Sequence, residues 1–174
     1  MKARVHFGVE TKRVRETSPL EKLDAILKGS KKDLVRRGEE LEPILDRVQD
    51  AEDDPTRVLM YARLEGRTVG IADAQLNTPA PRDITIAQIA VHPRGRNQNV
   101  GRALVLSVLI AAKKELRELG SIAAAIHPEN HGAAAFWEAL GLRADESDLE
   151  AKDSTIIFTG PADELLEALR ESAG

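Results

Sequence analysis

The chain has 174 residues, a formal net charge of −4 at pH 7 and no cysteine, and only 3% of its residues are aromatic. This length suits one domain spanning residues 1–174, the lack of cysteine excludes disulfide bonds and thiolate metal sites, and four scattered histidines predict no other metal site. Because no apolar run is long enough for a signal peptide or a membrane span, and no basic stripe is interleaved with aromatic residues, we expect a cytoplasmic protein that binds neither membranes nor nucleic acid.

The N-terminal part, residues 1–56, is predicted to form a strand and two helices. The strand runs from Ala3 to Glu10, although its apolar and polar residues alternate imperfectly. Ser18, Pro19 and Glu21 match a helix start, with a capping residue, a proline at the first helical position and a capping box. We therefore expect one helix from Pro19 to about Lys28, and a second where apolar residues follow helical spacing at Leu41, Ile44, Leu45 and Val48.

The middle part of the chain, residues 57–142, begins with three predicted strands. Arg57 to Leu64 and Thr68 to Gln75 form a hairpin whose turn contains a glycine. Two prolines between Asn77 and Pro81 then break the chain. The β-branched run from Ile84 to Val91 forms the third strand.

A polar loop, residues 92–99, joins this third strand to a predicted helix from Val100 to Leu119. The loop delivers the N-terminus of the helix to the end of the strand. Such a terminus carries unpaired backbone N–H groups and the positive end of the helix dipole, which suit an anion. Gly101 has no side chain, so an anion can approach the backbone there. The pattern predicts an anion-binding loop, for which an ordinary strand-to-helix connection is the alternative.

Two further strand and helix pairs complete the predicted order. Ser121 to Ile126 forms a buried strand, and a helix follows from about His131 to Leu140, capped by Asn130. In the C-terminal part, residues 143–174, we expect a strand from Thr155 to Thr159 and a helix from Pro161 to Arg170. That last helix carries three leucines on one face, and it either covers the edge of the sheet or contributes to a homodimer interface.

Two motifs in the middle part resemble those of the GNAT acetyltransferases. Gln98-x-x-Gly101-x-Ala103 fits the Gln/Arg-x-x-Gly-x-Gly/Ala signature of that family. Residues 130–142, Asn130-His131-Gly132-Ala133-Ala134-Ala135-Phe136-Trp137-Glu138-Ala139-Leu140-Gly141-Leu142, resemble its Asn-x-x-Ala-x-x-aromatic-Tyr-Glu-x-Leu-Gly-Phe segment. The resemblance is specific over residues 84–142. It implies an α/β fold with a mixed, mostly antiparallel sheet flanked by helices, in which two parallel strands splay apart, and to which the C-terminal helix is an addition.

The resemblance also implies acetyl-CoA as the cofactor. It places the backbone amides from Gln98 through Ala103 on the pyrophosphate, with charge from Arg96 and Arg102, and the backbone of Ile89, Ala90 and Val91 on the pantetheine arm. Asn97 and Asn99 stand where glycines are common, but asparagine tolerates positive φ, and Asn99 could also cap the helix. Asn130 is either a contact to the arm or a helix cap alone. The predicted cofactor-binding residues are Ile89, Ala90, Val91, Arg96, Asn97, Gln98, Asn99, Val100, Gly101, Arg102, Ala103, Asn130 and Trp137.

The residues that would carry the chemistry are less well defined. Acetyl transfer from a thioester to an amine needs a neutral amine, a polarised carbonyl and a proton for the thiolate. Many family members donate that proton from a tyrosine, whose position is Trp137 here, and an indole N–H is too weak an acid for this role. His127, at the end of the second central strand, is the best-placed titratable residue and our catalytic candidate, with an ordinary loop residue as the alternative. Glu129 and Asp73 are weaker candidates.

These patterns predict an acyl-CoA-dependent N-acyltransferase. We expect it to transfer acetyl from acetyl-CoA to a primary amine by direct attack in a ternary complex. The alternative is an acyl-CoA-binding regulatory or scaffold module with weak or no catalysis, because Trp137 replaces the tyrosine, and Ala87 and Ala125 occupy positions where some relatives carry glutamate. The acceptor is an amine of a small molecule or a peptide, and no motif in the sequence identifies which one. Acidic stretches at residues 38–56 and 143–174 favour a cationic amine, or they are ordinary solvated surface.

Overall fold

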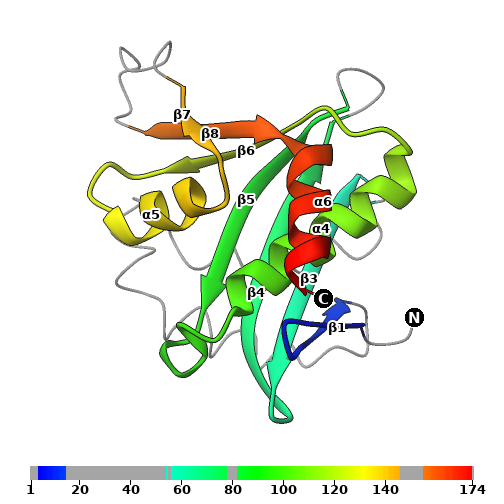
Figure 1. The fold of residues 1–174 in the computed structure, drawn as a ribbon, viewed down its shortest axis with the longest axis vertical. Coiled ribbons are helices and arrows are strands. Elements are labelled where there is room, and N and C mark those ends of the chain that lie inside the picture. Colours follow the sequence, from blue (N-terminus) through cyan, green and yellow to red (C-terminus); the bar gives the residue numbers. More distant parts are fainter. Residues whose placement is uncertain (1–3, 15–53, 55, 78–81, 146–154, 174) are drawn as a thin grey trace.

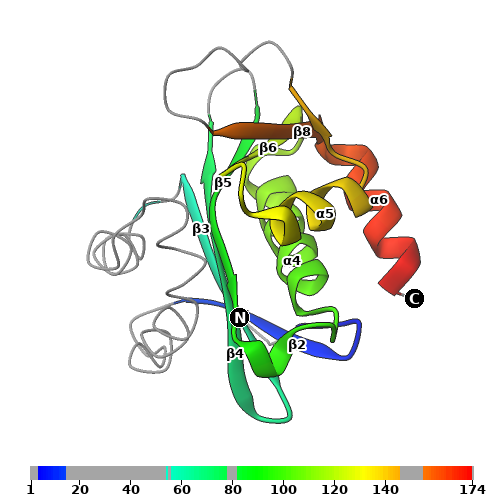
Figure 2. The same cartoon turned by 90° about the vertical axis from the view of Figure 1, so that its left-hand side faces the viewer.

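The computed structural model of this chain describes residues 4–14, 54, 56–77, 82–145 and 155–173 (Figure 1). Within these residues, eight strands form one sheet in the order β1-β2-β3-β4-β5-β6-β8-β7. Helices α4, α5 and α6 lie on one side of that sheet, as the edge-on view in Figure 2 shows. The elements are β1 (Arg4–His6), β2 (Val9–Arg13), β3 (Arg57–Leu64), β4 (Arg67–Leu76), β5 (Ile84–Val91), the 3-10 turn η2 (Pro93–Gly95), α4 (Val100–Leu116), β6 (Ser121–Ile126), α5 (His131–Ala139), β7 (Arg143–Ala144), β8 (Ile156–Pro161) and α6 (Ala162–Ala173).

The two central strands, β5 and β6, are parallel, whereas every other neighbouring pair in the described sheet is antiparallel. Their pairing covers only Ile84–Ile86 of β5, opposite Ile122–Ala124 of β6. Beyond Ile86 the strands separate, and Figure 1 shows them diverging toward different sides of the molecule. The predicted mixed, mostly antiparallel sheet with a splayed parallel pair is therefore confirmed.

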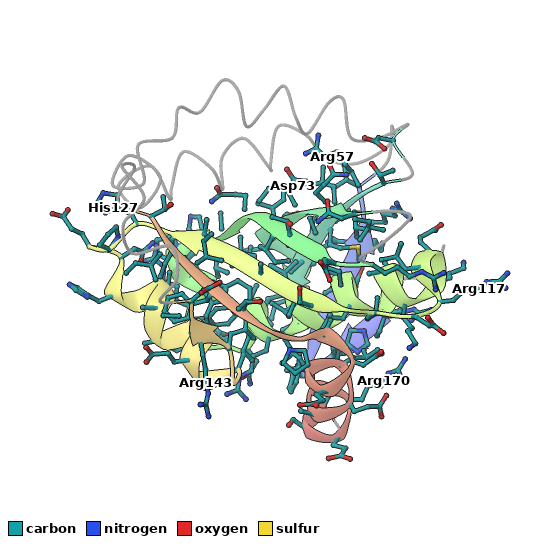
Figure 3. The ribbon with its side chains drawn as sticks, turned by 90° about the horizontal axis from the view of Figure 1, so that it is seen from above. Arg57, Asp73, Arg117, His127, Arg143 and Arg170 are labelled. Carbon is teal, nitrogen blue, oxygen red and sulfur yellow. The ribbon has the colours of Figure 1, made fainter. Side chains whose placement is uncertain are left out.

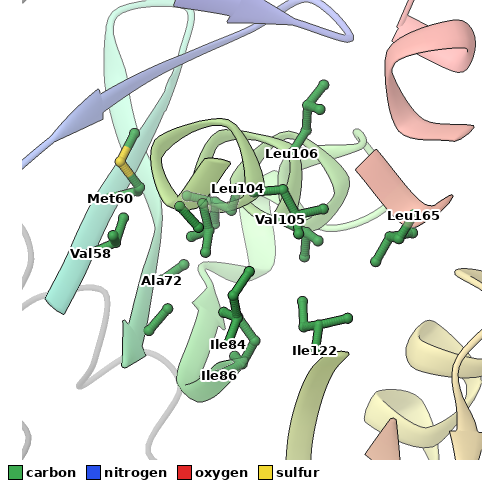
Figure 4. Close-up of a cluster of buried hydrophobic side chains, with 14 of the residues drawn as sticks. Val58, Met60, Ala72, Ile84, Ile86, Leu104, Val105, Leu106, Ile122 and Leu165 are labelled. Carbon is green, nitrogen blue, oxygen red and sulfur yellow. The ribbon is translucent and has the colours of Figure 1, made fainter. Parts of the chain in front are cut away.

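A β-bulge in β5 lies where the splay begins. Asp73 of β4 is opposite Gln88, but the next residue, Ala74, is opposite Ile86, so Ala87 is an extra residue in β5. Ile84 and Ile86 belong to the hydrophobic core and point toward α4 (Figure 4). After the bulge, Ile89 is opposite Ala72, whose side chain also belongs to that core, whereas Gln88 shares the other face of the sheet with Asp73.

The hydrophobic core lies between the sheet and α4. Helix α4 packs on β2, β3, β4 and β5, and its Leu104 is fully buried. Figure 4 shows this side chain among apolar residues of β3, β4, β5 and β6. Burying a leucine or isoleucine contributes about 1.5–3 kcal/mol. This packing fixes α4 on the sheet and so fixes where its N-terminus lies relative to the end of β5.

The C-terminal helix α6 does not cover an edge of the described sheet, so the first of the two alternatives predicted for it is wrong. Among the described strands, the edges of the sheet are β1 and β7, whereas α6 packs against α4, β6 and β8. Its apolar residues Leu165, Leu166 and Leu169 are buried within the chain. The helical spacing correctly predicted that α6 has an apolar face. That face packs on the side of α4 that points away from the sheet, and not on a sheet edge.

Several element boundaries also differ from the predictions. The single N-terminal strand expected from Ala3 to Glu10 is instead the hairpin of β1 and β2, because Phe7 and Gly8 adopt positive φ and form a turn. Helix α4 ends at Leu116 rather than Leu119, since Arg117 also has positive φ. The last strand and helix extend a few residues further than expected. The two helices predicted from Pro19 to Lys28 and from Leu41 to Val48 lie outside the described residues.

The hairpin predicts a pH dependence of stability through His6. The Nε2 atom of this side chain is buried without a hydrogen-bond partner among the described residues. Burial, and secondarily the charge of Arg4, lowers the pKa of His6 below its usual value. The unfolded chain therefore binds the proton more readily, so this contribution to stability is present above about pH 6.5 and is lost as the pH falls. We expect His6→Gln to flatten the decline in the free energy of unfolding between about pH 7.5 and pH 5.

Denaturant unfolding of both proteins at a series of pH values measures this effect. His131→Gln is the matched control, because His131 is exposed. Equal pH slopes for the wild type and His6→Gln would show that His6 does not sense pH.

Candidate functional site

A cavity of about 770 Å³ opens where β5 and β6 separate. Its wall comes from the second half of β5, the loop after η2, the N-terminus of α4, the loop after β6 and the first two turns of α5. The lining residues are Gln88, Ile89, Ala90, Val91, Gly95, Arg96, Asn97, Asn99, Val100, Gly101, Arg102, Glu129, Asn130, His131, Gly132, Ala133, Phe136 and Trp137.

The β5 side of the cavity presents backbone groups. Ile89, Ala90 and Val91 pair with β4 along one edge of the strand, opposite Ala72, Ile71 and Gly70. The other edge would pair with β6 in a regular sheet, but that pairing ends at Ile86. Backbone N–H and C=O groups on this edge therefore face the cavity, where an extended ligand can use them.

The loop before α4 has the backbone conformation that the sequence suggested. Asn97 and Asn99 both have a φ of 60°, so asparagine occupies left-handed positions that glycine often fills. The predicted side-chain cap by Asn99 is wrong: it precedes α4 but makes no capping hydrogen bond. A capping residue usually has extended φ and ψ, and the left-handed backbone of Asn99 aims its side chain elsewhere. The capping side chain in this loop belongs to His92, at the start of the preceding 3-10 turn η2. Its Nδ1 accepts a hydrogen bond from the N–H of Arg94 at 3.1 Å.

The N-terminus of α4 lies in the cavity wall. The N–H groups of Val100, Gly101 and Arg102 have no acceptor within the helix, because the first intrahelical bond runs from Ala103 N to Asn99 O at 2.9 Å. These amides, the helix dipole and the side chains of Arg96 and Arg102 make this end of the cavity favourable for an anion.

Two of the predicted cofactor-binding residues do not line the cavity. Ala103 is fully buried and its N–H is used within α4. The side-chain Nε2 of Gln98 donates to the carbonyl oxygen of Arg94 at 2.7 Å, so this residue closes the loop. The other eleven all line the cavity.

Helix α5 closes the opposite wall and contacts α4 closely. A Cβ atom at Gly101 would lie 2.9 Å from Cε2 of Phe136, nearer than real Cβ contacts allow, so the ring packs directly on the glycine. Phe136 also meets Trp137 edge-on, with ring centroids 4.9 Å apart, and Trp137 is buried. Gly101 is therefore required by the packing of two helices. The sequence pattern had suggested only that it leaves room for an anion.

Asn130 both caps α5 and lines the cavity. Its Oδ1 accepts a hydrogen bond from the N–H of Ala133 at 3.1 Å, which confirms the predicted cap. The residue also belongs to the cavity wall. Capping therefore does not remove it from the site.

The catalytic candidate His127 lies outside the cavity lining, as does the weaker candidate Asp73. The Nδ1 of His127 accepts a hydrogen bond from the N–H of Glu129 at 3.2 Å, which shapes the loop after β6. That loop instead presents Glu129, the other weaker candidate, and His131 to the cavity. His131 and Gln88 are polar lining residues that the sequence predictions left out of the site. The signal for Gln88 was a polar residue in the second half of β5, whose other residues there are apolar.

Among the described residues, no helix is both long and apolar enough to cross a membrane. Within the same parts of the chain, no group of three His, Asp or Glu side chains could hold a metal ion.

The fold agrees with comparisons to known proteins. The chain matches the model of the acetyltransferase (GNAT) family over residues 23–142, more than half of its length, and it therefore belongs to that family, which uses acetyl-CoA. Among curated proteins, none matches the sequence.

Solved structures share the fold at low sequence identity. An acetyltransferase from Thermus thermophilus has a TM-score of 0.70 and 22% identity, covering 90% of this chain and 99% of its own. The ribosomal-protein-S18-alanine N-acetyltransferase of Escherichia coli has a TM-score of 0.63 and 18% identity, with coverages of 88% and 94%. PaiA N-acetyltransferase from Thermoplasma acidophilum, solved in complex with coenzyme A, has a TM-score of 0.66 and 15% identity, with coverages of 88% and 98%.

Proposed function

We propose that this protein transfers an acetyl group from acetyl-CoA to a primary amine, by direct attack in a ternary complex. The observation that carries the proposal is the cavity that joins the unpaired edge of β5 to the N-terminus of α4. An extended arm with a phosphate group at one end matches both parts of this wall. Membership of the GNAT family, and the coenzyme A complex of the PaiA structure, support the choice of cofactor.

Each part of the wall has a role in holding the cofactor. The amides of Val100, Gly101 and Arg102 bind the pyrophosphate, and charge-assisted hydrogen bonds of this kind contribute about 1.5–3 kcal/mol each. Arg96 and Arg102 add positive charge at the same end. The free edge of β5 pairs with the amide groups of the pantetheine arm, and Asn130 lies on the opposite wall.

The reaction itself needs few groups from the protein. The amine nitrogen attacks the thioester carbonyl carbon, a C–N bond forms, the C–S bond breaks, and the proton lost by the amine balances the one taken up by the thiolate. Holding both reactants in one cavity can contribute about 7–11 kcal/mol to lowering the barrier. This chain contains no cysteine, so a covalent acyl-cysteine intermediate is excluded.

The acceptor is an amine of a small molecule or of a peptide. The Escherichia coli neighbour is by its name an N-acetyltransferase for the alanine of ribosomal protein S18, which makes a peptide amine one reasonable class to test. Trp137 lines the cavity and, by the motif resemblance, stands where many family members carry a tyrosine, which favours a second candidate function, an acyl-CoA-binding module with weak turnover.

Calorimetric and thermal titrations with acetyl-CoA and with free CoA test the proposal. Acetyl-CoA at about 100 times its dissociation constant should add about 2.7 kcal/mol to the free energy of unfolding, which raises Tm by several degrees. Thiol release in the presence of a panel of small amines and short peptides then tests turnover. Binding without turnover would support the weak module, and no binding of either ligand would contradict both functions.

A further inference from the structure

We propose that Gln88 positions the acceptor amine, on the face of the sheet opposite α4. The inference rests on the proposed acetyltransferase function and concerns the half of the site that the cofactor-binding motifs do not describe. Gln88 is a positioning residue whose uncharged amide accepts a hydrogen bond from the attacking amine.

The location follows from the path of the cavity. One end lies at the N-terminus of α4, on the side of the sheet that carries the three described helices. The cavity then follows β5 into the gap between β5 and β6, and its lining includes Gln88. Because Gln88 is directly opposite Asp73, its side chain lies on the other face. A ligand anchored at α4 therefore extends through the gap and presents its far end near Gln88.

This face of the sheet has a buried polar character beside the gap. Asp73 is only 4% exposed and forms an ion pair with Arg57, and Figure 3 shows both residues on the side of the sheet away from α6. Gln88 is 3% exposed, and its Nε2 donates a hydrogen bond to the carbonyl oxygen of Ile89 at 3.5 Å. Burying polar side chains in the middle of a sheet is costly. A buried amide and a buried ion pair therefore make this end of the site distinct from the apolar core on the α4 side.

The bulge explains why Gln88 is the residue on this face. In a regular strand, Gln88 would share a face with Ile84 and Ile86 and point toward α4. The extra residue, Ala87, reverses the alternation, so the amide turns to the face of Asp73 at the point where the gap opens.

An amide suits an amine that must react as a neutral nucleophile. A carboxylate at this position would stabilise the ammonium form and raise the pKa of the amine, which delays attack to higher pH. The carboxylate of Asp73 is itself paired with the guanidinium group of Arg57. The other charged or titratable side chains that line the cavity, within the described part of the chain, are Arg96, Arg102, Glu129 and His131.

Steady-state kinetics of two variants test this role, using the amine that the wild type acetylates. Gln88→Ala should raise the KM for the amine by about 3- to 10-fold, the range expected for a lost neutral hydrogen bond, and leave the Kd for acetyl-CoA unchanged. Gln88→Glu should move the pH profile of kcat/KM for the amine to higher pH by about one unit or more. Thr85→Ala is the control, because Thr85 is an exposed residue of β5 outside the cavity.

The outcomes separate this inference from the proposed function. If the wild type binds acetyl-CoA and acetylates an amine, but neither variant changes the KM or the pH profile, Gln88 is structural and the inference is wrong while the function stands. If the Gln88 variants only lower Tm, without a change in the KM or the pH profile, the conclusion is the same: Gln88 is structural. If the wild type acetylates no amine, the proposed function fails and the inference fails with it.

Discussion

Gly101→Val is expected to weaken acetyl-CoA binding at least tenfold and to lower the free energy of unfolding by about 1–3 kcal/mol, the usual cost of overpacking. The valine would meet Phe136 before it meets any ligand, since even its Cβ would lie 2.9 Å from the ring. Either the ring or the N-terminus of α4 must then shift. Both lie in the cavity wall, so the amides of Val100, Gly101 and Arg102 lose their alignment. Calorimetric titration and denaturant unfolding of the same samples measure the two effects.

A double variant separates packing from ligand binding. Phe136→Leu removes the ring edge that a side chain at position 101 would meet. In that background, Gly101→Ala should therefore lower the free energy of unfolding less than it does in the wild type. Acetyl-CoA binding by the double variant should nevertheless stay weaker than binding by Phe136→Leu alone. Recovery of both quantities would mean that Gly101 serves only the contact between helices. Gly160→Ala is the matched control, because a Cβ there would meet Leu142 at an ordinary 3.4 Å and Gly160 lies outside the cavity.

The elements of this fold that the sequence predicted best are those with a strong local signal. The apolar run of β5, the helical spacing of α4 and the capping of α5 by Asn130 each depend on neighbours within a few residues. The positive φ of the two asparagines before α4 was also predicted correctly, because tolerance of positive φ is a property of the residue itself, although the predicted cap by Asn99 was not. Joined in order, these elements were enough to place one wall of the cavity.

The features that the sequence did not predict depend on contacts between distant segments. The bulge at Ala87 exists only in the register of β5 against β4, and it decides on which face Gln88 lies. The contact of Phe136 with Gly101 joins two helices that are separated by a strand. His127 was favoured because it is titratable and ends a central strand, but the turn that follows carries Glu129 and His131 to the cavity instead.

Replacing Trp137 by tyrosine is expected to raise turnover at saturating substrates at least tenfold above that of the Trp137→Phe variant. By family resemblance, Trp137 occupies the position of a tyrosine that protonates the departing thiolate, and it lines the cavity with only 3% of its surface exposed. A well-placed general acid contributes about 10²–10⁴-fold, and a phenol with a pKa near 10 can supply the proton that an indole cannot. Both variants lose the larger ring, so they share the cost in packing, and their ratio isolates the hydroxyl group.

The same experiment decides between the two candidate functions. If Trp137→Tyr turns over faster than the wild type, the site is built for acetyl transfer and the tryptophan limits its rate. If the wild type is at least as fast as Trp137→Tyr, its departing thiolate takes a proton from another source, such as water. Equal turnover by the tyrosine and phenylalanine variants would show that the hydroxyl does not reach the thiolate. If neither variant nor the wild type releases thiol while all three bind acetyl-CoA, the protein is a binding module. The reason would then lie beyond Trp137, in positions such as Ala87 and Ala125 that carry no acid or base.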